Sequence, residues 1–362
     1  MLLRSHAQDP PNARPFVLSR SFYAGSQRWG AIWTGDNAAR WDHLEISAPM
    51  LLTIGASGLP FAGADVGGFF GNCDAELVTR WTQAGAYQPF FRGHAHHDSA
   101  RREPWLFGDE TLSRLRSATM ERYQLLPYWY TQFHTASLTG LPTMRPMWME
   151  FPTNSDVVDM DKQWMVGRDL MVCPVLSPRK TSVQCYFPAE NDWYNVRNFQ
   201  KEDGKGDRTV QAPADQIPVY QRSGSVVYRK LRLRRSSETM KRDPLTLYVA
   251  PDAAGSAEGL LYMDDENTIA HEAGAFCRRR FVLAGGRLSN VDDSGEGGGD
   301  IELANWVERV VLMGWARQPR SVRVEGGAEL DWNYDAQSQL LVVRKPDLKI
   351  HGKGSDWTIA FD

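Results

Sequence analysis

Residues 14–63 read RPFVLSRSFYAGSQRWGAIWTGDNAARWDHLEISAPMLLTIGASGLPFAG, and this stretch decides the fold of the first part of the chain. The short apolar runs at residues 16–18 and 31–33 predict two buried strands. Apolar residues recur at helical spacing over residues 41–54, and residues 59–62 predict a third strand. Strands that alternate with helices favour a parallel sheet with helical crossovers.

The next hundred residues continue this alternation. A long helical pattern begins near Asp109, and Pro127 is expected to kink it because proline cannot donate the helical hydrogen bond. Gly140 ends the pattern. Residues 143–151 then predict a fourth apolar strand.

The residue pattern changes near Asp156. From there, short strand-like runs separated by Gly, Pro, Asn and Asp predict antiparallel β-structure. The basic string at residues 229–235 separates two sets of such runs and predicts a solvated strand or linker. We therefore expect domains at residues 1–155, 156–236 and 237–362. The strand-like runs cover residues 165–175, 183–187, 193–194, 217–220, 225–228, 245–250, 259–263, 280–283, 307–313, 322–324 and 340–343.

Composition excludes several classes of protein. With 362 residues the chain is long enough for more than one core, and 42% hydrophobic and 23% charged residues are ordinary for a globular protein. A net charge of -3 gives no reason to expect a nucleic acid or an anionic membrane as partner. The first fifteen residues, MLLRSHAQDPPNARP, lack the apolar core of a signal peptide, and no run is long enough to span a membrane.

The four cysteines form no CxxC pair, so neither a zinc site nor a dense disulfide framework is indicated. Cys173 and Cys185 lie on apolar, strand-like segments. We expect both to be buried free thiols.

The segment WTGDN at residues 33–37 ends an expected strand and precedes an expected helix. In parallel sheets and barrels, ligands bind where the carboxyl ends of strands open into loops. Asp36 therefore has two interpretations, either an Asx turn or helix N-cap, or a catalytic carboxylate. Glycoside hydrolysis needs two carboxyl groups on opposite sides of the anomeric carbon.

Two further segments carry polar groups at expected strand ends. Asp65 lies in GADVGGF at residues 63–69, whose glycines allow either close approach to a ligand or merely a tight turn. Residues 91–98 read FRGHAHHD, which suggests a metal at first sight. Because no helical pair of histidines occurs there, we favour a polar rim with one histidine bonding a sugar, and no metal.

These pieces occur in an order that resembles the glycosidases of glycoside hydrolase family 31, and within it the glucosidase II α group. The similarity runs from about Arg14 to the C-terminus. The family's usual glycine after the paired aspartates is Glu266 here. The motifs that carry the resemblance are residues 14–44, GLPFAGADVGGF at 58–69, YQPFFRGHAHHDSARREPW at 87–105, PTMRPMWMEFP at 142–152, LRRSSETMKRDPLTLYVA at 233–250 and YMDDENT at 262–268.

The resemblance implies a role for each matching residue. Asp36 matches the general acid/base. Arg20, which could instead be a structural ion-pair partner, and His94 would donate to sugar hydroxyls. Arg101, Arg102 and Glu103 are read as charges that stabilise the loop of His94. The residues that match the pocket for the terminal glucose are Arg20, Trp33, Asp65, Phe69 and His94.

One expected element is missing from the sequence. The family's nucleophile is an Asp in a Trp-x-Asp-Met-Asn-Glu-like motif, upstream of the first segment here, and this sequence contains no such motif. Asp159-Met160-Asp161 falls after the last expected barrel strand and is no substitute. We therefore expect a C-terminal fragment that is inactive alone; a separate shortened product is the alternative.

The resemblance also implies a fold, a reaction and a setting. The fold is α/β plus all-β: the C-terminal part of a (β/α)8 TIM barrel, then two antiparallel β-sandwich domains. The reaction is retaining hydrolysis of terminal α-linked glucose from N-glycans in the endoplasmic-reticulum lumen, without cofactor, with a possible non-catalytic β subunit as partner. Alternatives are a non-catalytic carbohydrate-binding or subunit-docking fragment, and another family 31 specificity such as xylosidase or lyase.

Overall fold

The computed structural model describes residues 12–295, 298–299, 301–352 and 354–362. We expected no signal peptide in the first fifteen residues. Residues 1–11 of that segment lie outside the described residues. No helix of the described chain is long and apolar enough to cross a membrane.

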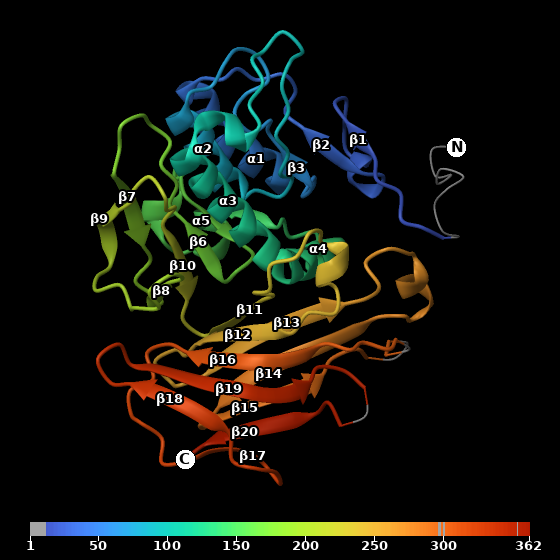
Figure 1. Ribbon diagram of the computed structural model, residues 1–362, viewed down its shortest axis with the longest axis vertical. Coiled ribbons are helices and arrows are strands. Elements are labelled where there is room, and N and C mark those ends of the chain that lie inside the picture. Colours follow the sequence, from blue (N-terminus) through green and yellow to red (C-terminus); the bar gives the residue numbers. More distant parts are fainter. Residues whose placement is uncertain (1–11, 296–297, 300, 353) are drawn as a thin grey trace.

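The first part of the chain combines a small parallel sheet with four long helices (Figure 1). Strand β2 lies between β1 and β3, and both pairings are parallel, which confirms the predicted parallel sheet. Asp74 caps α2, because its carboxylate accepts a hydrogen bond from the Leu77 amide at 2.7 Å. The elements are β1 (Leu18–Ser19), β2 (Ala31–Trp33), α1 (Trp41–Ala56), β3 (Ala62–Gly63), α2 (Ala75–Gly85), α3 (Asp109–Gln124) and α4 (Leu126–Thr139), with 3-10 turns at Ser26–Arg28 and Pro104–Phe107.

Two local predictions in this part differ from the structure. Phe16 is exposed and precedes β1, so the run at residues 16–18 is no buried strand. The long helical pattern is two helices rather than one kinked helix, because Pro127 occupies the first turn of α4, where no helical amide is needed. Gly140 ends α4 in the left-handed conformation, as predicted.

The second part is a five-stranded sheet in the order β4-β5-β6-β10-β8, beside a two-stranded ribbon of β7 and β9. Residues 143–151 were predicted as one apolar strand that closes the first part. Only Met144–Pro146 is a strand, and it pairs antiparallel with β5. The elements are β4 (Met144–Pro146), α5 (Met147–Glu150), a 3-10 turn (Ser155–Val157), β5 (Trp164–Val166), β6 (Leu170–Val172), β7 (Ser182–Phe187), β8 (Trp193–Asn195), β9 (Gly206–Gln211) and β10 (Val219–Arg222).

The third part is a ten-stranded sheet that forms the lower layers of Figure 1. Its pairings are antiparallel as predicted, except that β11 with β13 and β12 with β16 are parallel. The elements are β11 (Ser225–Arg229), a 3-10 turn (Glu238–Met240), β12 (Leu245–Ala250), β13 (Ala257–Met263), a 3-10 turn (Ala270–Ala273), β14 (Cys277–Ala284), β15 (Arg287–Asp292), β16 (Trp306–Leu312), β17 (Val322–Val324), β18 (Asp331–Asp335), β19 (Leu340–Lys349) and β20 (Trp357–Phe361).

Two cysteines that were expected to be free are bonded. Cys173 follows β6 and Cys185 lies in β7, with their Cα atoms 5.7 Å apart and their sulfurs joined in a disulfide. The prediction of free thiols was wrong because a separation of twelve residues carries no signal for pairing, which depends on how the ribbon folds back onto the sheet. Both residues are buried, as predicted.

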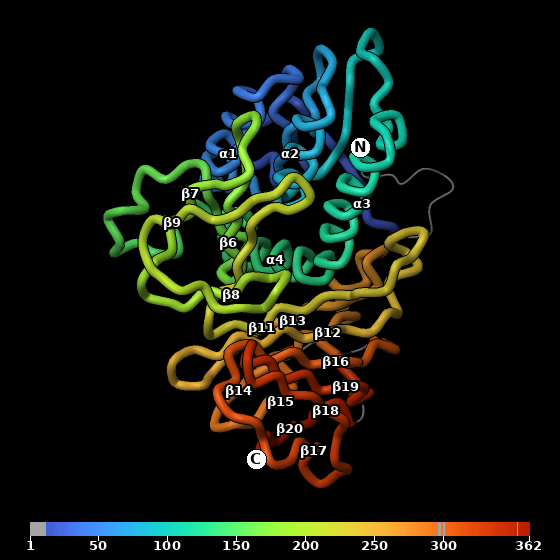
Figure 2. Tube along the Cα trace, turned by 60° about the vertical axis from the view of Figure 1, so that its left-hand side comes forward, coloured from blue at the N-terminus to red at the C-terminus, as the bar shows by residue number. Residues whose placement is uncertain are grey.

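A buried arginine fastens the first part to the second. The guanidinium of Arg80 on α2 donates to the backbone carbonyls of Lys180, Ala212, Pro213 and Gln216, at 2.7 to 3.0 Å. Figure 2 shows β7 and β9 beside the helices of the first part. Helix α2 is therefore anchored to the second part through the hydrogen bonds of Arg80.

Candidate active site

Asp36 and Arg20 meet at the carboxyl ends of two adjacent parallel strands. Asp36 follows β2 and Arg20 follows β1, and Arg20 Nη1 lies 3.2 Å from Asp36 Oδ2. Both side chains reach solvent, with exposed fractions of 28% for Asp36 and 60% for Arg20. This edge of the sheet is where loops of parallel strands bind ligands.

Two observations bear on the local interpretations of these two residues. The N-cap of α1 is Arg40, so Asp36 does not cap that helix. Gly35 has a φ of 84°, and a Cβ there would come within 3.0 to 3.3 Å of the Arg20 guanidinium. The glycine thus lets Arg20 approach Asp36, and the ion pair of Arg20 is with the candidate catalytic carboxylate itself.

Asp65 follows β3 and is almost fully buried, with 1% of its side chain exposed. Its Oδ1 accepts a hydrogen bond from Arg92 Nη2 at 2.5 Å, while its Oδ2 has no partner among the described residues. Burial raises the pKa of the Asp65 carboxyl, and the charge of Arg92 opposes that rise. Buried polar atoms are rarely left unpaired, so Oδ2 suits a hydroxyl donor from a ligand.

Trp33, at the end of β2, lies against the same arginine. The Arg92 guanidinium carbon is 5.1 Å from the centre of the Trp33 ring, a cation–π contact. The indole Nε1 of Trp33 is buried without an acceptor in the described part of the chain. Arg92 was not singled out from the sequence, although it stands two residues before His94; its role depends on Asp65, which is 27 residues away.

Asn37 holds the loops after β2 and β3 together. Its Oδ1 accepts from the Phe69 amide at 2.8 Å, and its Nδ2 donates to the Asp65 carbonyl at 3.1 Å. Gly68 allows this contact, because a Cβ there would lie only 2.2 Å from the Ala39 nitrogen. Asp36 was singled out from the sequence, but its neighbour Asn37 was not. Asn37 fixes the position of Phe69 relative to Asp36.

Phe69 and His94 face each other across two loops. Their ring centres are 5.1 Å apart and the rings are nearly parallel, at 30°. Arg102 donates to the carbonyls of His94 and Gly67, so it ties the two loops together as predicted. Arg101 and Glu103 pair with each other at 2.6 Å on the surface.

The histidine-rich segment lies beside Phe69. His96 Nδ1 is 3.5 Å and His97 Nε2 is 3.2 Å from carboxylate oxygens of Asp98, and the three groups offer ligand atoms within 4.8 Å of one another. His97 and Asp98 are exposed. This geometry permits a cation, so the polar rim without a metal stays a prediction.

The structure thus brings the predicted residues to one edge of the parallel sheet through shared contacts. Arg20 contacts Asp36, Phe69 contacts His94, and Asp65 and Trp33 both contact Arg92. The arrangement combines an accessible carboxyl group, buried acceptors and donors, and aromatic walls. These groups suit the binding of a polyhydroxylated ligand and the protonation of an oxygen in the bond that is cleaved.

Comparison with known proteins gives two family matches. The glycosyl hydrolases family 31 TIM-barrel domain matches residues 2–132, and the glycosyl hydrolase family 31 C-terminal domain matches residues 140–227. Together these matches cover more than half of the 362 residues.

Individual relatives cover nearly the whole chain. Neutral alpha-glucosidase AB of Dictyostelium discoideum is 46% identical over 344 residues, which is 94% of this chain and 36% of the relative. The crystal structure of glucosidase II alpha subunit in its Glc1Man2-bound form is 38% identical with a TM-score of 0.89, over 97% of this chain and 40% of that one. A heterodimeric complex of ER glucosidase II, comprising the catalytic subunit and the binding domain of the regulatory subunit, is 39% identical, also at 0.89 and over the same shares of the two chains. The chain therefore spans about two fifths of the length of these relatives.

Proposed function

The chain belongs to glycoside hydrolase family 31, and from this premise we propose that it carries the general acid/base and part of the glucose pocket of a retaining α-glucosidase. The observation that supports the proposal best is the pairing of Asp36 with Arg20 at adjacent strand ends. Asp65, whose buried Oδ2 has no partner among the described residues, follows β3, the next strand of the same sheet.

The proposed reaction assigns two proton transfers to Asp36. In the first step a carboxylate nucleophile attacks the anomeric carbon, and protonated Asp36 donates to the departing sugar oxygen. In the second step Asp36 accepts a proton from the water that breaks the glycosyl-enzyme, and configuration is retained. No metal or organic cofactor takes part in this proposal.

The other residues hold the terminal glucose. Asp65 Oδ2 accepts from a sugar hydroxyl, and Arg20 and His94 donate to others. Trp33 and Phe69 form the apolar walls against the ring.

The second carboxylate must come from outside the motifs of this sequence. We propose that it lies upstream of residue 1 on a strand with a Trp-x-Asp-Met-Asn-like motif, because the chain matches only 36% of the length of its relative. On this proposal residues 1–155 are the later strands of a (β/α)8 barrel, and the rest of the chain forms two β-sandwich domains, with β11 in the sheet of the second. Mapping the 5′ end of the transcript and reading the frame upstream of Met1 tests it.

The proposed substrate is the terminal α-linked glucose of N-glycans, and the proposed setting is the endoplasmic-reticulum lumen. A solved relative is described as bound to Glc1Man2, and another as part of a heterodimer, which supports a glucosylated glycan substrate and a non-catalytic β subunit as partner. The disulfide between Cys173 and Cys185 supports an oxidising compartment.

The absence of the nucleophile motif from the sequence favours one alternative, a non-catalytic carbohydrate-binding or subunit-docking protein. If the frame does not extend upstream of Met1, this alternative replaces the enzyme. The same reading of the transcript therefore separates the two functions.

Asp36→Ala tests the role of the acid/base in the polypeptide that includes the nucleophile. We expect hydrolysis of an α-glucosyl disaccharide to fall by about 10²–10⁴-fold, because one general acid or base contributes about that much. Azide should restore turnover of 4-nitrophenyl α-glucoside, because it attacks the glycosyl-enzyme without needing a base and forms α-glucosyl azide.

The matched control is Glu110→Gln, which removes an exposed carboxylate of α3 that pairs with Arg114, and it should leave turnover unchanged. A loss in Asp36→Ala smaller than tenfold, or β-glucosyl azide as the product, would contradict the assignment.

A further inference from the structure

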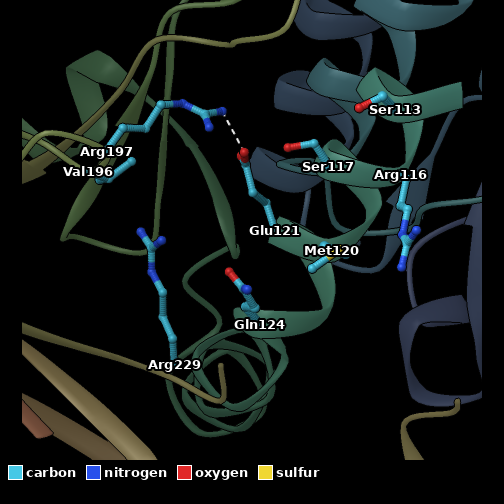
Figure 3. Close-up of a pocket in the computed structure, with 9 residues that line it drawn as sticks. All are labelled: Ser113, Arg116, Ser117, Met120, Glu121, Gln124, Val196, Arg197 and Arg229. Carbon is cyan, nitrogen blue, oxygen red and sulfur yellow. Dashed lines mark ion pairs between the residues drawn. The ribbon is translucent and has the colours of Figure 1, made fainter. Parts of the chain in front are cut away.

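A pocket of about 460 Å³ lies between α3, the loop after β8 and the end of β11 (Figure 3). None of the residues placed in the candidate active site lines this pocket. Its charged lining consists of Arg116, Glu121, Arg197 and Arg229. The lining thus holds three guanidinium groups and one carboxylate, which leaves the pocket with an excess of positive charge.

Arg229 is the least expected of these groups. The basic string at residues 229–235 was predicted to be solvated, but Arg229 ends β11 with only 8% of its surface exposed. Within the described residues it makes no ion pair, and its buried Nε has no acceptor. Its guanidinium carbon lies 5.0 Å from the ring centre of Tyr248, a cation–π contact that supplies no oxygen acceptor.

The neighbouring arginine is only partly satisfied. Arg197 Nη2 lies 2.6 Å from Glu121 Oε1, while its buried Nε also lacks an acceptor in the described chain. The other oxygen of Glu121 accepts a hydrogen bond from the Tyr87 hydroxyl at 3.0 Å. Glu121 therefore pairs with Arg197 and accepts from Tyr87, and within the described residues it does not pair with Arg229.

The close-up shows how these groups are arranged. The Arg229 guanidinium points toward Val196 and Arg197, and Ser117 lies beside Glu121 on the face of α3 that borders the pocket (Figure 3). Arg116 stands apart from the other two guanidiniums. A ligand between β11 and α3 would therefore meet Arg229 and Arg197 from one side and the Ser117 hydroxyl from the other.

We propose that this pocket binds a small molecule through an oxyanion, a phosphate or carboxylate group held by Arg229 and Arg197. The planar fork of a guanidinium matches two oxygens of either group. Water would satisfy the free N–H groups but would leave the positive charge uncompensated, and burying a charge without a partner is costly. The volume falls in the range of small-molecule sites.

Titration calorimetry of the purified chain tests this proposal with inorganic phosphate and with malonate as separate probes. Sodium chloride holds the ionic strength constant, so that general screening of charge produces no signal. We expect saturable binding of at least one probe, and the probe that binds more tightly identifies the group as phosphate or carboxylate. Arg229→Met keeps the apolar stem against Tyr248 and should raise the dissociation constant by at least ~10-fold.

Two further variants serve as a control and as a second test of the proposal. Arg114→Met, on the same helix but outside the pocket and paired with Glu110, should bind like the parent chain. Ser117→Ala should weaken binding by ~3-fold even if Arg229→Met fails to fold. Absence of saturable binding to both probes in the parent chain, or equal binding in the parent, Arg229→Met and Ser117→Ala, would overturn the proposal.

Discussion

Two opposing influences act on the carboxyl group of Asp65. Burial disfavours its charged form and raises its pKa, whereas Arg92 at 2.5 Å favours the charged form. The pKa in the folded protein remains above the ordinary value, so ionised Asp65 lowers stability once the pH exceeds about 4. The fold thus holds a buried carboxyl group at the expense of stability, which is a common property of binding sites.

Arg92→Met should increase the loss of stability that ionised Asp65 causes. Without the guanidinium the pKa of Asp65 rises further, because burial is then opposed only by the weaker influences of His94 and Arg102. In the parent protein the folded carboxyl of Asp65 stays protonated up to its own pKa, which lies above about 4, so the loss of stability in the variant should be small at pH 4 and grow as the pH rises. Urea unfolding at pH 4 and pH 7 measures this, and we expect about 3 kcal/mol at pH 7.

Arg101→Met is the matched control, because Arg101 pairs with Glu103 on the exposed surface nearby. It should change stability by less than about 0.5 kcal/mol at either pH. A loss in Arg92→Met that is equal at pH 4 and pH 7 would mean that packing, and not the charge of Asp65, explains the effect.

Among the structural elements, the disulfide connects two that belong to different sheets. Cys173 follows β6 of the five-stranded sheet, and Cys185 lies in β7 of the ribbon. The bond closes a short loop and so restricts the unfolded chain. It also holds the ribbon near α2, whose Arg80 donates to Lys180 just before β7.

Replacing both Cys173 and Cys185 with Ala should lower the free energy of unfolding by about 2–4 kcal/mol, which thermal or urea unfolding measures. Cys73→Ser, a change at a free and half-buried cysteine, serves as control and should have a much smaller effect. Peptide mapping without reductant should recover the Cys173–Cys185 pair. Its absence from protein secreted through an oxidising compartment would refute the assignment.

On the scale of the whole molecule, Asp264 joins distant parts of the chain. Its side chain is 1% exposed and accepts from Arg14 Nη2 at 2.5 Å, from the Tyr130 hydroxyl at 2.7 Å and from the Tyr262 hydroxyl at 2.7 Å. These partners come from the start of the described chain, from α4 and from β13. Burial would raise the pKa of Asp264, but these hydrogen bonds outweigh it and hold the pKa below the ordinary value.

Asp264→Asn should therefore destabilise the whole molecule in a pH-dependent way. Because the folded pKa lies below the unfolded one, the stabilising effect of ionised Asp264 is full above about pH 4 and is lost as the pH falls through the folded value. We expect a loss of about 3 kcal/mol at pH 7 that narrows below pH 4, measured by urea unfolding.

Glu272→Gln, which removes an exposed carboxylate in the adjacent turn, should change stability little at any pH. A deficit in Asp264→Asn that stays constant down to pH 3 would show that the charge of Asp264 contributes nothing.

Much of the local structure was predictable from the sequence because neighbouring residues encode it. The strand at residues 31–33, the helix over residues 41–54 and the end of α4 at Gly140 follow from periodicity and from the backbone freedom of glycine. The ordered motifs around Asp36, Asp65 and His94 identified the family, which the matches to residues 2–132 and 140–227 confirm.

The contacts that complete the site and the fold could not be predicted in this way. Arg92 reaches Asp65 across 27 residues, Arg14 reaches Asp264 across 250, and β4 pairs with β5 rather than with the parallel sheet. Arg229 was expected in solvent because residues 229–235 alternate Arg with Leu, yet it is buried because β11 lies between β12 and β13. By itself the sequence determined the local elements and the chemistry of the motifs. Only the tertiary structure decided which charges meet and which stay without partners, because burial and pairing depend on residues that are distant along the chain.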